Sequence, residues 1–168
     1  RADSTAIWVA QIVGMQVRII DYMQDSFKEL DFYADWIKKN DYNGTQWLPH
    51  DSKHERLGMK GSIKSQLKTM GLTECNDLPA DSRETTRLLA KSLIKEAYID
   101  KTKCKDGLQA LRHEKAERAE KTGKWKEIHE IDGAAAFRYL AMAIENNQPK
   151  LLKTRTIKPR APVSAWSM

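Results

Sequence analysis

Residues 5–24 read TAIWVAQIVGMQVRIIDYMQ, two runs rich in β-branched and aromatic side chains separated by Gly14-Met15. Such side chains favour extended backbone, and a short glycine-containing link between two extended runs is typical of an antiparallel hairpin. We therefore predict strands over 5–13 and 16–24 that pair through a turn at 14–15.

Downstream of the hairpin, short apolar runs alternate with segments of helical spacing. We predict strands at 46–48, 72–78 and 97–99, and helices at 27–39, 62–71, from 81 or 82 to 93, 103–117 and 132–145. Ser62 and either Asp81 or Ser82 are predicted N-caps, Gly71 a helix end, and residues 123–130 a loop. This order predicts an α/β fold with a mixed sheet, an N-terminal antiparallel hairpin and helices on both faces.

Composition limits the class of protein. The chain has 168 residues, of which 40% are hydrophobic and 31% charged, as in soluble globular domains. No apolar run approaches the ~18 residues that cross a bilayer, and the N-terminal residues lack the apolar centre of a signal peptide. Cys75 and Cys104 form no CxxC pair, so neither a zinc site nor a disulfide framework is predicted.

Positive charge gathers at the C-terminal end. The net charge is +6, and five of these charges lie after Glu145, where no acidic residue occurs: Lys150, Lys153, Arg155, Lys158 and Arg160. A basic, proline-containing tail over 147–168 can contact phosphates. A solvated linker end is the alternative interpretation.

Common nucleotide and hydrolase motifs are missing. The sequence contains no GxxxxGK[ST], no GxGxxG and no GxSxG. His50 and His54 have the spacing of helical zinc ligands, but Pro49 and the nearby glycines argue against a helix there.

Asp51 is the best single candidate for chemistry. It follows a short apolar strand and Pro49, and it precedes a basic segment with Lys53, Arg56, Lys60, Lys64 and Lys68. Functional groups gather at the carboxyl ends of strands in α/β sheets, and a carboxylate there can hold Mg²⁺ or Mn²⁺. The alternatives are that Asp51 only caps a turn and that Lys64 and Lys68 lie on a solvated helix face.

Four segments together resemble a known family. Residues 1–8 (RADSTAIW) resemble the end of a D-x-G-x-x-D-x-T-A-I-W motif, and 47–51 (WLPHD) contain an L-P-H-D segment. Residues 104–112 (CKDGLQALR) are similar to C-x-x-G-L-x-A-L, and 133–140 (GAAAFRYL) to H-G-A-D-A-F-R-Y-L. In this order, over about residues 1–146, they resemble the C-terminal nuclease domain of the large terminase subunit of tailed bacteriophages.

The resemblance implies a ribonuclease H-like fold and a metal-dependent endonuclease with two Mg²⁺ or Mn²⁺ ions. It implies a domain over 1–146 that cuts concatemeric double-stranded DNA during viral DNA packaging. The implied partners are double-stranded DNA, the portal protein, the small terminase subunit and an N-terminal ATPase domain of the same protein. The implied location is the host cytoplasm, without a membrane.

Two departures from the family pattern bear on activity. The first metal-binding Asp falls three residues before Arg1, outside this sequence, and Ala135 stands where the third is expected. Asp51 keeps its motif position. Asp132 occupies the place of the motif's His, and it either substitutes partly for the missing Asp as a metal ligand or caps the helix. Asp3 matches the motif's second Asp, and it is either an outer-shell group near the metals or an exposed terminal residue.

The departures predict poor metal binding and poor cleavage, because two close divalent ions need several carboxylates to offset their repulsion. We expect phosphate contacts from Arg56, Lys60, Lys64 and the tail. The alternatives are a non-catalytic DNA-binding or docking module and another ribonuclease H-like nuclease, such as a junction resolvase. The nuclease prediction requires Asp51 and the first turn of the last helix to lie side by side.

Overall fold

A computed structural model describes residues 4–52, 61–118, 125–129 and 131–147, and in the segments 115–118 and 125–129 it describes the backbone only. The elements are β1 (Ser4–Val13), β2 (Gln16–Ser26), α1 (Leu30–Lys39), β3 (Gln46–Leu48), α2 (Ile63–Thr69), β4 (Cys75–Asp77), α3 (Arg83–Glu96), β5 (Tyr98–Ile99), α4 (Lys105–His113), β6 (Lys115–Arg118), β7 (Trp125–His129) and α5 (Asp132–Asn147). The predicted tail after Asn147 lies outside the described residues.

The predicted N-terminal hairpin is confirmed. Strands β1 and β2 pair antiparallel from Ser4 opposite Ser26 to Val13 opposite Gln16. Gly14 occupies the turn with φ +62°, a conformation that glycine adopts without steric cost. On the other edge of β2, β5 pairs in parallel through residues 98 and 99, so this three-stranded sheet is mixed.

A bulge in β2 sets which side chains face the core. The register shifts at Val9/Ala10, because β2 carries one extra residue there. The shift changes the alternation along the strand, so Ile19 and Tyr22, which are an odd number of residues apart, both join Trp8 in one core cluster. The bulge therefore lets Ile19 and Tyr22 pack in the same core cluster as Trp8.

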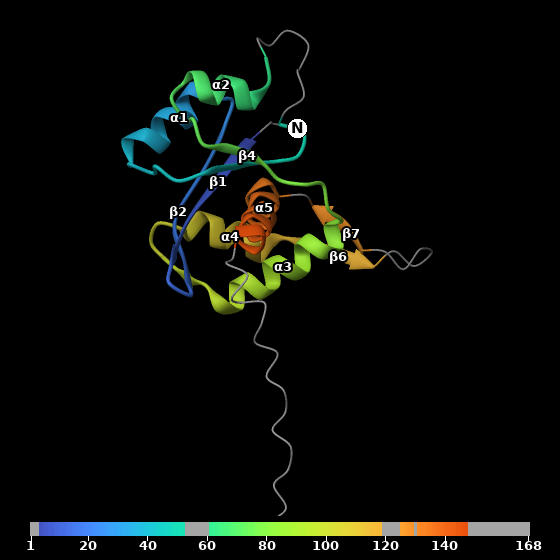
Figure 1. Cartoon of the computed structure of the whole chain (residues 1–168). Coiled ribbons are helices and arrows are strands. Elements are labelled where there is room, and N and C mark those ends of the chain that lie inside the picture. Colours follow the sequence, from blue (N-terminus) through green and yellow to red (C-terminus); the bar gives the residue numbers. More distant parts are fainter. Residues whose placement is uncertain (1–3, 53–60, 119–124, 130, 148–168) are drawn as a thin grey trace, which may run out of the picture.

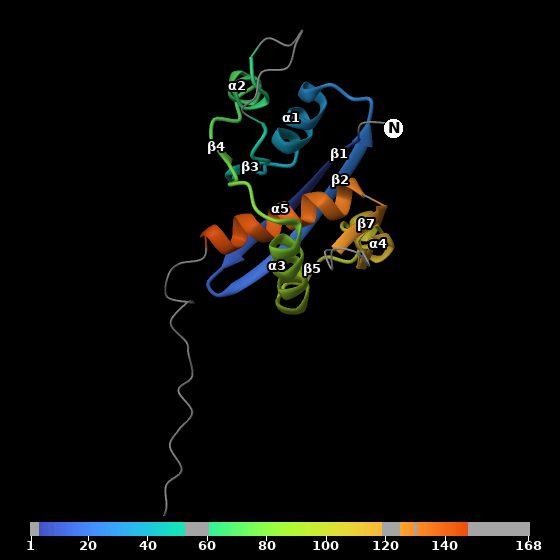
Figure 2. The same ribbon diagram turned by 90° about the vertical axis from the view of Figure 1, so that its right-hand side faces the viewer.

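Helices pack on both faces of the hairpin (Figures 1 and 2). Trp8 packs with residues of α3 and α5, including Leu93 and Phe137. The preceding residue, Ile7, packs against a second cluster that includes Ala34 of α1 and Leu67 of α2. Successive side chains of a strand point to opposite faces, so the two clusters occupy opposite sides of β1.

Helix α5 also connects the hairpin with a second small sheet. Strands β3 and β4 pair in parallel, with Leu48 opposite Asp77. Met142 and Ala143 of α5 pack with Leu78 and Trp47 at this sheet, while Phe137 belongs to the hairpin cluster. The helix thereby holds the end of β3 close to the hairpin.

Two parts of the sequence prediction are wrong in detail. The helix predicted over 103–117 ends at His113, and 115–118 form β6, antiparallel to β7 at 125–129, where a loop was predicted. Beyond Leu111 this segment offers a helix no further large apolar residue to bury, so strand pairing replaces it. The strands of the described residues also divide among three sheets rather than one.

The sequence signals for the ends of α2 and α3 agree with the structure. Ser62 accepts a hydrogen bond from the backbone N–H of Ser65, and Ser82 accepts one from that of Thr85, so both are N-caps. Gly71 follows α2 with φ +95°, as predicted for a helix end. No helix among the described residues is both long enough and apolar enough to span a bilayer.

Candidate functional site

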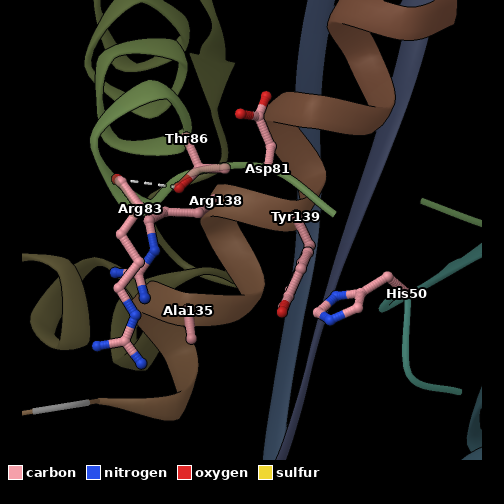
Figure 3. Close-up of a pocket in the computed structure, with 7 residues that line it drawn as sticks. All are labelled: His50, Asp81, Arg83, Thr86, Ala135, Arg138 and Tyr139. Atoms are coloured by element: carbon pink, nitrogen blue, oxygen red, sulfur yellow. Dashed lines mark hydrogen bonds between the residues drawn. The ribbon is translucent and has the colours of Figure 1, made fainter. Parts of the chain in front are cut away.

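A pocket opens where the loop after β3 meets the first turns of α3 and α5. Its lining residues are His50, Asp81, Arg83, Thr86, Ala135, Arg138 and Tyr139. Figure 3 shows Ala135 between two groups of side chains, with the guanidinium ends of Arg83 and Arg138 on one side and Tyr139 and His50 on the other. The Asp81 side chain points away from Ala135. Residues 85 positions apart in the sequence thus share one site.

The first turn of α5 is fixed by contacts with the hairpin. Trp8 Nε1 donates a 2.8 Å hydrogen bond to the carbonyl of Gly133. Gly133 is buried and close to Tyr22, whose hydroxyl donates to the side chain of Gln24. Burial raises the pKa of Tyr22 to about 12, with the carboxylates of Asp106 and Asp132 adding to the effect, so Tyr22 stays a neutral donor.

Asp132 is not the N-cap that one interpretation predicted. It is the first helical residue of α5, and its carboxylate accepts a 2.5 Å hydrogen bond from Ser4 Oγ at the start of β1. Ser4 in turn accepts from Gln24 Nε2 at 2.9 Å. The N–H groups of Ala134 and Ala135 bond instead to the carbonyl of Ile131. Asp132 therefore ties β1 to α5 at the edge of the site.

Asp51 lies in the turn after β3, exposed and next to the pocket residue His50. The turn itself is well anchored through Ser52, whose N–H donates to the carbonyl of Pro49 at 3.0 Å. Ser52 is buried and its hydroxyl donates to Asp77 Oδ1 at 2.9 Å. The backbone that carries Asp51 is thus held from the neighbouring strand.

Asp77 is a carboxylate that the sequence reasoning missed. It ends β4 beside the end of β3 and forms a 2.7 Å ion pair with Lys64 Nζ, with both side chains about one quarter exposed. Its position near the end of the predicted strand 72–78 was the available signal, but the pairing of β3 with β4 could not be read from the sequence. Lys64, a predicted DNA contact, therefore has a carboxylate partner.

The arginines of the pocket were also missed. Arg138 is almost buried and forms an ion pair with Glu114 at the end of α4, and Arg87 of α3 lies 3.9 Å from the same carboxylate oxygen. Arg138 belongs to the GAAAFRYL segment, one helical turn after Ala135, which was the one sequence signal for it. No sequence signal pointed to Arg83 or Arg87 of α3.

The described residues do not fit a two-metal centre. Among them, no group of three or more His, Cys, Asp and Glu side chains converges as a metal site requires. Ala135 offers no ligand, and Asp77 already pairs with Lys64. Asp3, Arg56, Lys60 and the basic tail, all predicted to contribute, lie outside the described residues.

Comparison with known proteins gives one structural likeness. No family model matches the chain, and no curated protein matches it. Two crystal structures of the large terminase nuclease from thermophilic phage G20c are similar to it, one with bound cobalt and one with bound magnesium. Each is 16% identical with a TM-score of 0.48; the first comparison covers 84% of this chain and 81% of that chain, the second 85% and 82%.

Proposed function

We propose that this chain is a ribonuclease H-like nuclease domain of the kind found in the large terminase subunit of tailed bacteriophages. In this proposal it acts on double-stranded DNA during viral DNA packaging. The observation that carries the proposal is that His50, from the L-P-H-D segment, and Ala135, from the G-A-A-A-F-R-Y-L segment, line one pocket. The resemblance assigns the nuclease centre to these two segments.

The same pocket explains why we propose impaired cleavage. Phosphodiester hydrolysis by this class of nuclease relies on two divalent ions, which activate water and stabilise the leaving oxygen. Close cations repel each other strongly, so several carboxylates must surround them. The position that the family fills with its third metal-binding Asp is Ala135 here, whereas Asp51 keeps its motif position.

The charge of the chain supports DNA as the ligand. The net charge is +6, and contacts to backbone phosphates give sequence-independent binding, which suits a protein that handles any DNA. The portal protein, the small terminase subunit and an ATPase domain of the same protein are the partners we propose, in the host cytoplasm.

Metal binding and plasmid cleavage test the proposal together. The chain, Ala135→Asp, Ala135→Asn and the double variant Ala135→Asp/Asp51→Asn are titrated with Mn²⁺ and incubated with supercoiled plasmid. We expect Ala135→Asp to raise Mn²⁺ affinity by roughly tenfold or more, because it adds a full negative charge at the site. The Asn variant, equal in size but uncharged, is the matched control and gains nothing.

The double variant decides whether the two segments form one centre. It should lose the gain in Mn²⁺ affinity, since Asp51 is the proposed second ligand. Equal affinity of the single and double variants would refute the shared centre, and efficient cleavage by the unchanged chain would refute the impairment.

A non-catalytic DNA-binding module is the second candidate. The observation that favours it is Ala135, which offers no carboxylate at the position where the family has its third metal-binding Asp. If Ala135→Asp gains neither metal affinity nor cleavage while the unchanged chain still binds DNA, this candidate replaces the first.

A further inference from the structure

We propose that the surface around α1 binds the same surface of a second copy of this chain, so that two α1 helices pack antiparallel across a two-fold axis. We call this surface, formed by residues 27–39, the α1 patch. Its anchors are the aromatic rings of Phe27 and Phe32. The inference does not depend on the proposed function.

Two exposed aromatic residues mark the patch. Phe27, in the link from β2 to α1, is 85% exposed, and Phe32, in the first turn of α1, is 40% exposed. Phe27 also has φ +60°, a left-handed conformation that is unfavourable for a bulky side chain. A strained backbone that presents a large apolar ring to solvent is expected where the ring has a binding partner.

Contacts within the chain hold the patch in place. Tyr33 is buried, and its hydroxyl donates a 3.0 Å hydrogen bond to the carbonyl of Asp25 near the end of β2. Phe32 packs edge-on against Tyr33, with ring centroids 5.4 Å apart, and Lys28 Nζ lies 5.2 Å from the centroid of the Phe32 ring. Because these groups are already ordered, they lose little conformational freedom when a partner covers them. Figure 1 shows α1 at the outer edge of the molecule, where a second chain can reach it.

The charge of the patch suits a second copy of the chain. The whole chain has a net charge of +6, so two copies repel each other on average. The patch, by contrast, is neutral, because it carries three basic and three acidic side chains: Lys28, Lys38, Lys39, Glu29, Asp31 and Asp35. A neutral surface also offers DNA phosphates no net attraction.

The order of these charges favours an antiparallel pair. Asp31 lies in the first turn of α1, and Lys38 and Lys39 lie in its last turn. In a two-fold contact, residue i of one copy meets residue j of the other and j meets i, so each acidic first turn faces the basic last turn of the partner helix. The helix dipoles are then antiparallel as well, and the lysine stems can cover the Phe32 rings.

A second exposed apolar group, at the tip of the hairpin, lacks this charge match. Ile12, Val13 and Met15 are exposed there, but Arg18 is the one charged residue of 11–18. Two copies that met through the tip would bring like charges together. Met15 therefore supplies a control for the loss of an exposed apolar side chain.

Self-association of the full chain tests the proposal. Sedimentation equilibrium measures the average mass of the unchanged chain, Phe27→Gly and Met15→Ser from micromolar to millimolar concentrations. We expect a closed monomer–dimer equilibrium for the unchanged chain. Phe27→Gly should weaken association by roughly tenfold, as for the loss of one anchor residue, whereas Met15→Ser should stay within about twofold. Glycine adopts φ +60° without strain, so the urea midpoint of Phe27→Gly should not fall.

Charge reversal tests the antiparallel arrangement. Asp31→Lys and Lys39→Glu each place like charges opposite each other at both ends of the pair, so each variant alone should associate roughly fivefold more weakly. An equimolar mixture of the two variants should associate about as tightly as the unchanged chain, because a mixed pair has opposite charges at both ends. Circular dichroism verifies that each variant is folded.

The opposite results are equally clear. A chain that stays monomeric at every concentration, or a Phe27→Gly effect no larger than that of Met15→Ser, overturns the inference. An average mass that rises beyond two chains contradicts a closed pair, and a mixture that associates as weakly as the separate variants contradicts the antiparallel arrangement. If Phe27→Gly weakens binding to duplex DNA but leaves self-association unchanged, the patch belongs to DNA and the inference fails.

Discussion

The indole Nε1 of Trp8 donates a 2.8 Å hydrogen bond to the backbone carbonyl of Gly133. Trp8 is in the middle of β1 and Gly133 is in the first turn of α5, so this bond joins the first strand to the last helix. The same tryptophan packs edge-on against Phe137, with ring centroids 4.9 Å apart. Because Ala135 lies between Gly133 and Phe137, these contacts set the position of the pocket floor.

Gly133→Ala should destabilise the protein. A Cβ at this position would lie 2.4 Å from the Tyr22 hydroxyl and 2.9 Å from Ala110 Cβ, closer than atoms can approach without movement. We expect a loss of about 1–3 kcal/mol in the free energy of unfolding, measured by urea denaturation. Gly44→Ala is the control, because nothing lies within 4 Å of its added Cβ. Equal midpoints for both variants would contradict the packing.

Glu114→Gln should also lower stability, through the ion pair with Arg138. Both side chains are largely buried, 20% and 9% exposed, so solvent screens the pair weakly. We expect a loss of about 1.5–3 kcal/mol, the range for hydrogen bonds to charged groups. Asp35→Asn breaks the exposed pair with Lys38 and should cost at most about 1 kcal/mol. A cost for Glu114→Gln as small as that of the exposed pair would be evidence against the buried network.

Stability should fall in alkaline solution as Cys104 ionises. Burial raises the pKa of its thiol from 9.0 to about 11, with Asp21 and Asp100 adding to the shift. The unfolded chain therefore loses this proton first, and the stabilisation is complete below pH 9 and is lost as the pH rises toward 11. Urea midpoints at stepped pH values should fall less steeply for Cys104→Ala. Parallel curves for the two proteins would count against this origin.

Asp77→Asn should tighten DNA binding if Lys64 contacts phosphate as predicted. The substitution removes the carboxylate that pairs with Lys64 at 2.7 Å, while the amide oxygen can still accept from Ser52. We expect roughly threefold higher affinity for duplex DNA than Asp35→Asn shows, measured by fluorescence anisotropy of a labelled duplex. Asp35→Asn is the matched control, because it removes the same charge at an exposed ion pair on α1. No difference between the two variants would remove Lys64 from the DNA interface.

Much of the local structure follows from the sequence. The β-branched runs around Gly14 predict the hairpin, and Ser62 and Ser82 predict where α2 and α3 begin, because these signals act between residues close in the chain. The segment 103–118 is the exception. Its helical spacing extends past His113, but pairing with 125–129 competes with the helix and prevails.

Part of the candidate site could likewise be predicted from the sequence, and part could not. The motifs single out Asp51 and position 135, and residue types alone predict that Ala135 weakens metal binding. Only tertiary structure decides that Arg83 and Arg138 border Ala135 and that Asp77 pairs with Lys64. These contacts depend on how α3 packs on α5 and how β4 pairs with β3. Burial of apolar surface between elements distant in sequence fixes such packing, and no local pattern encodes it.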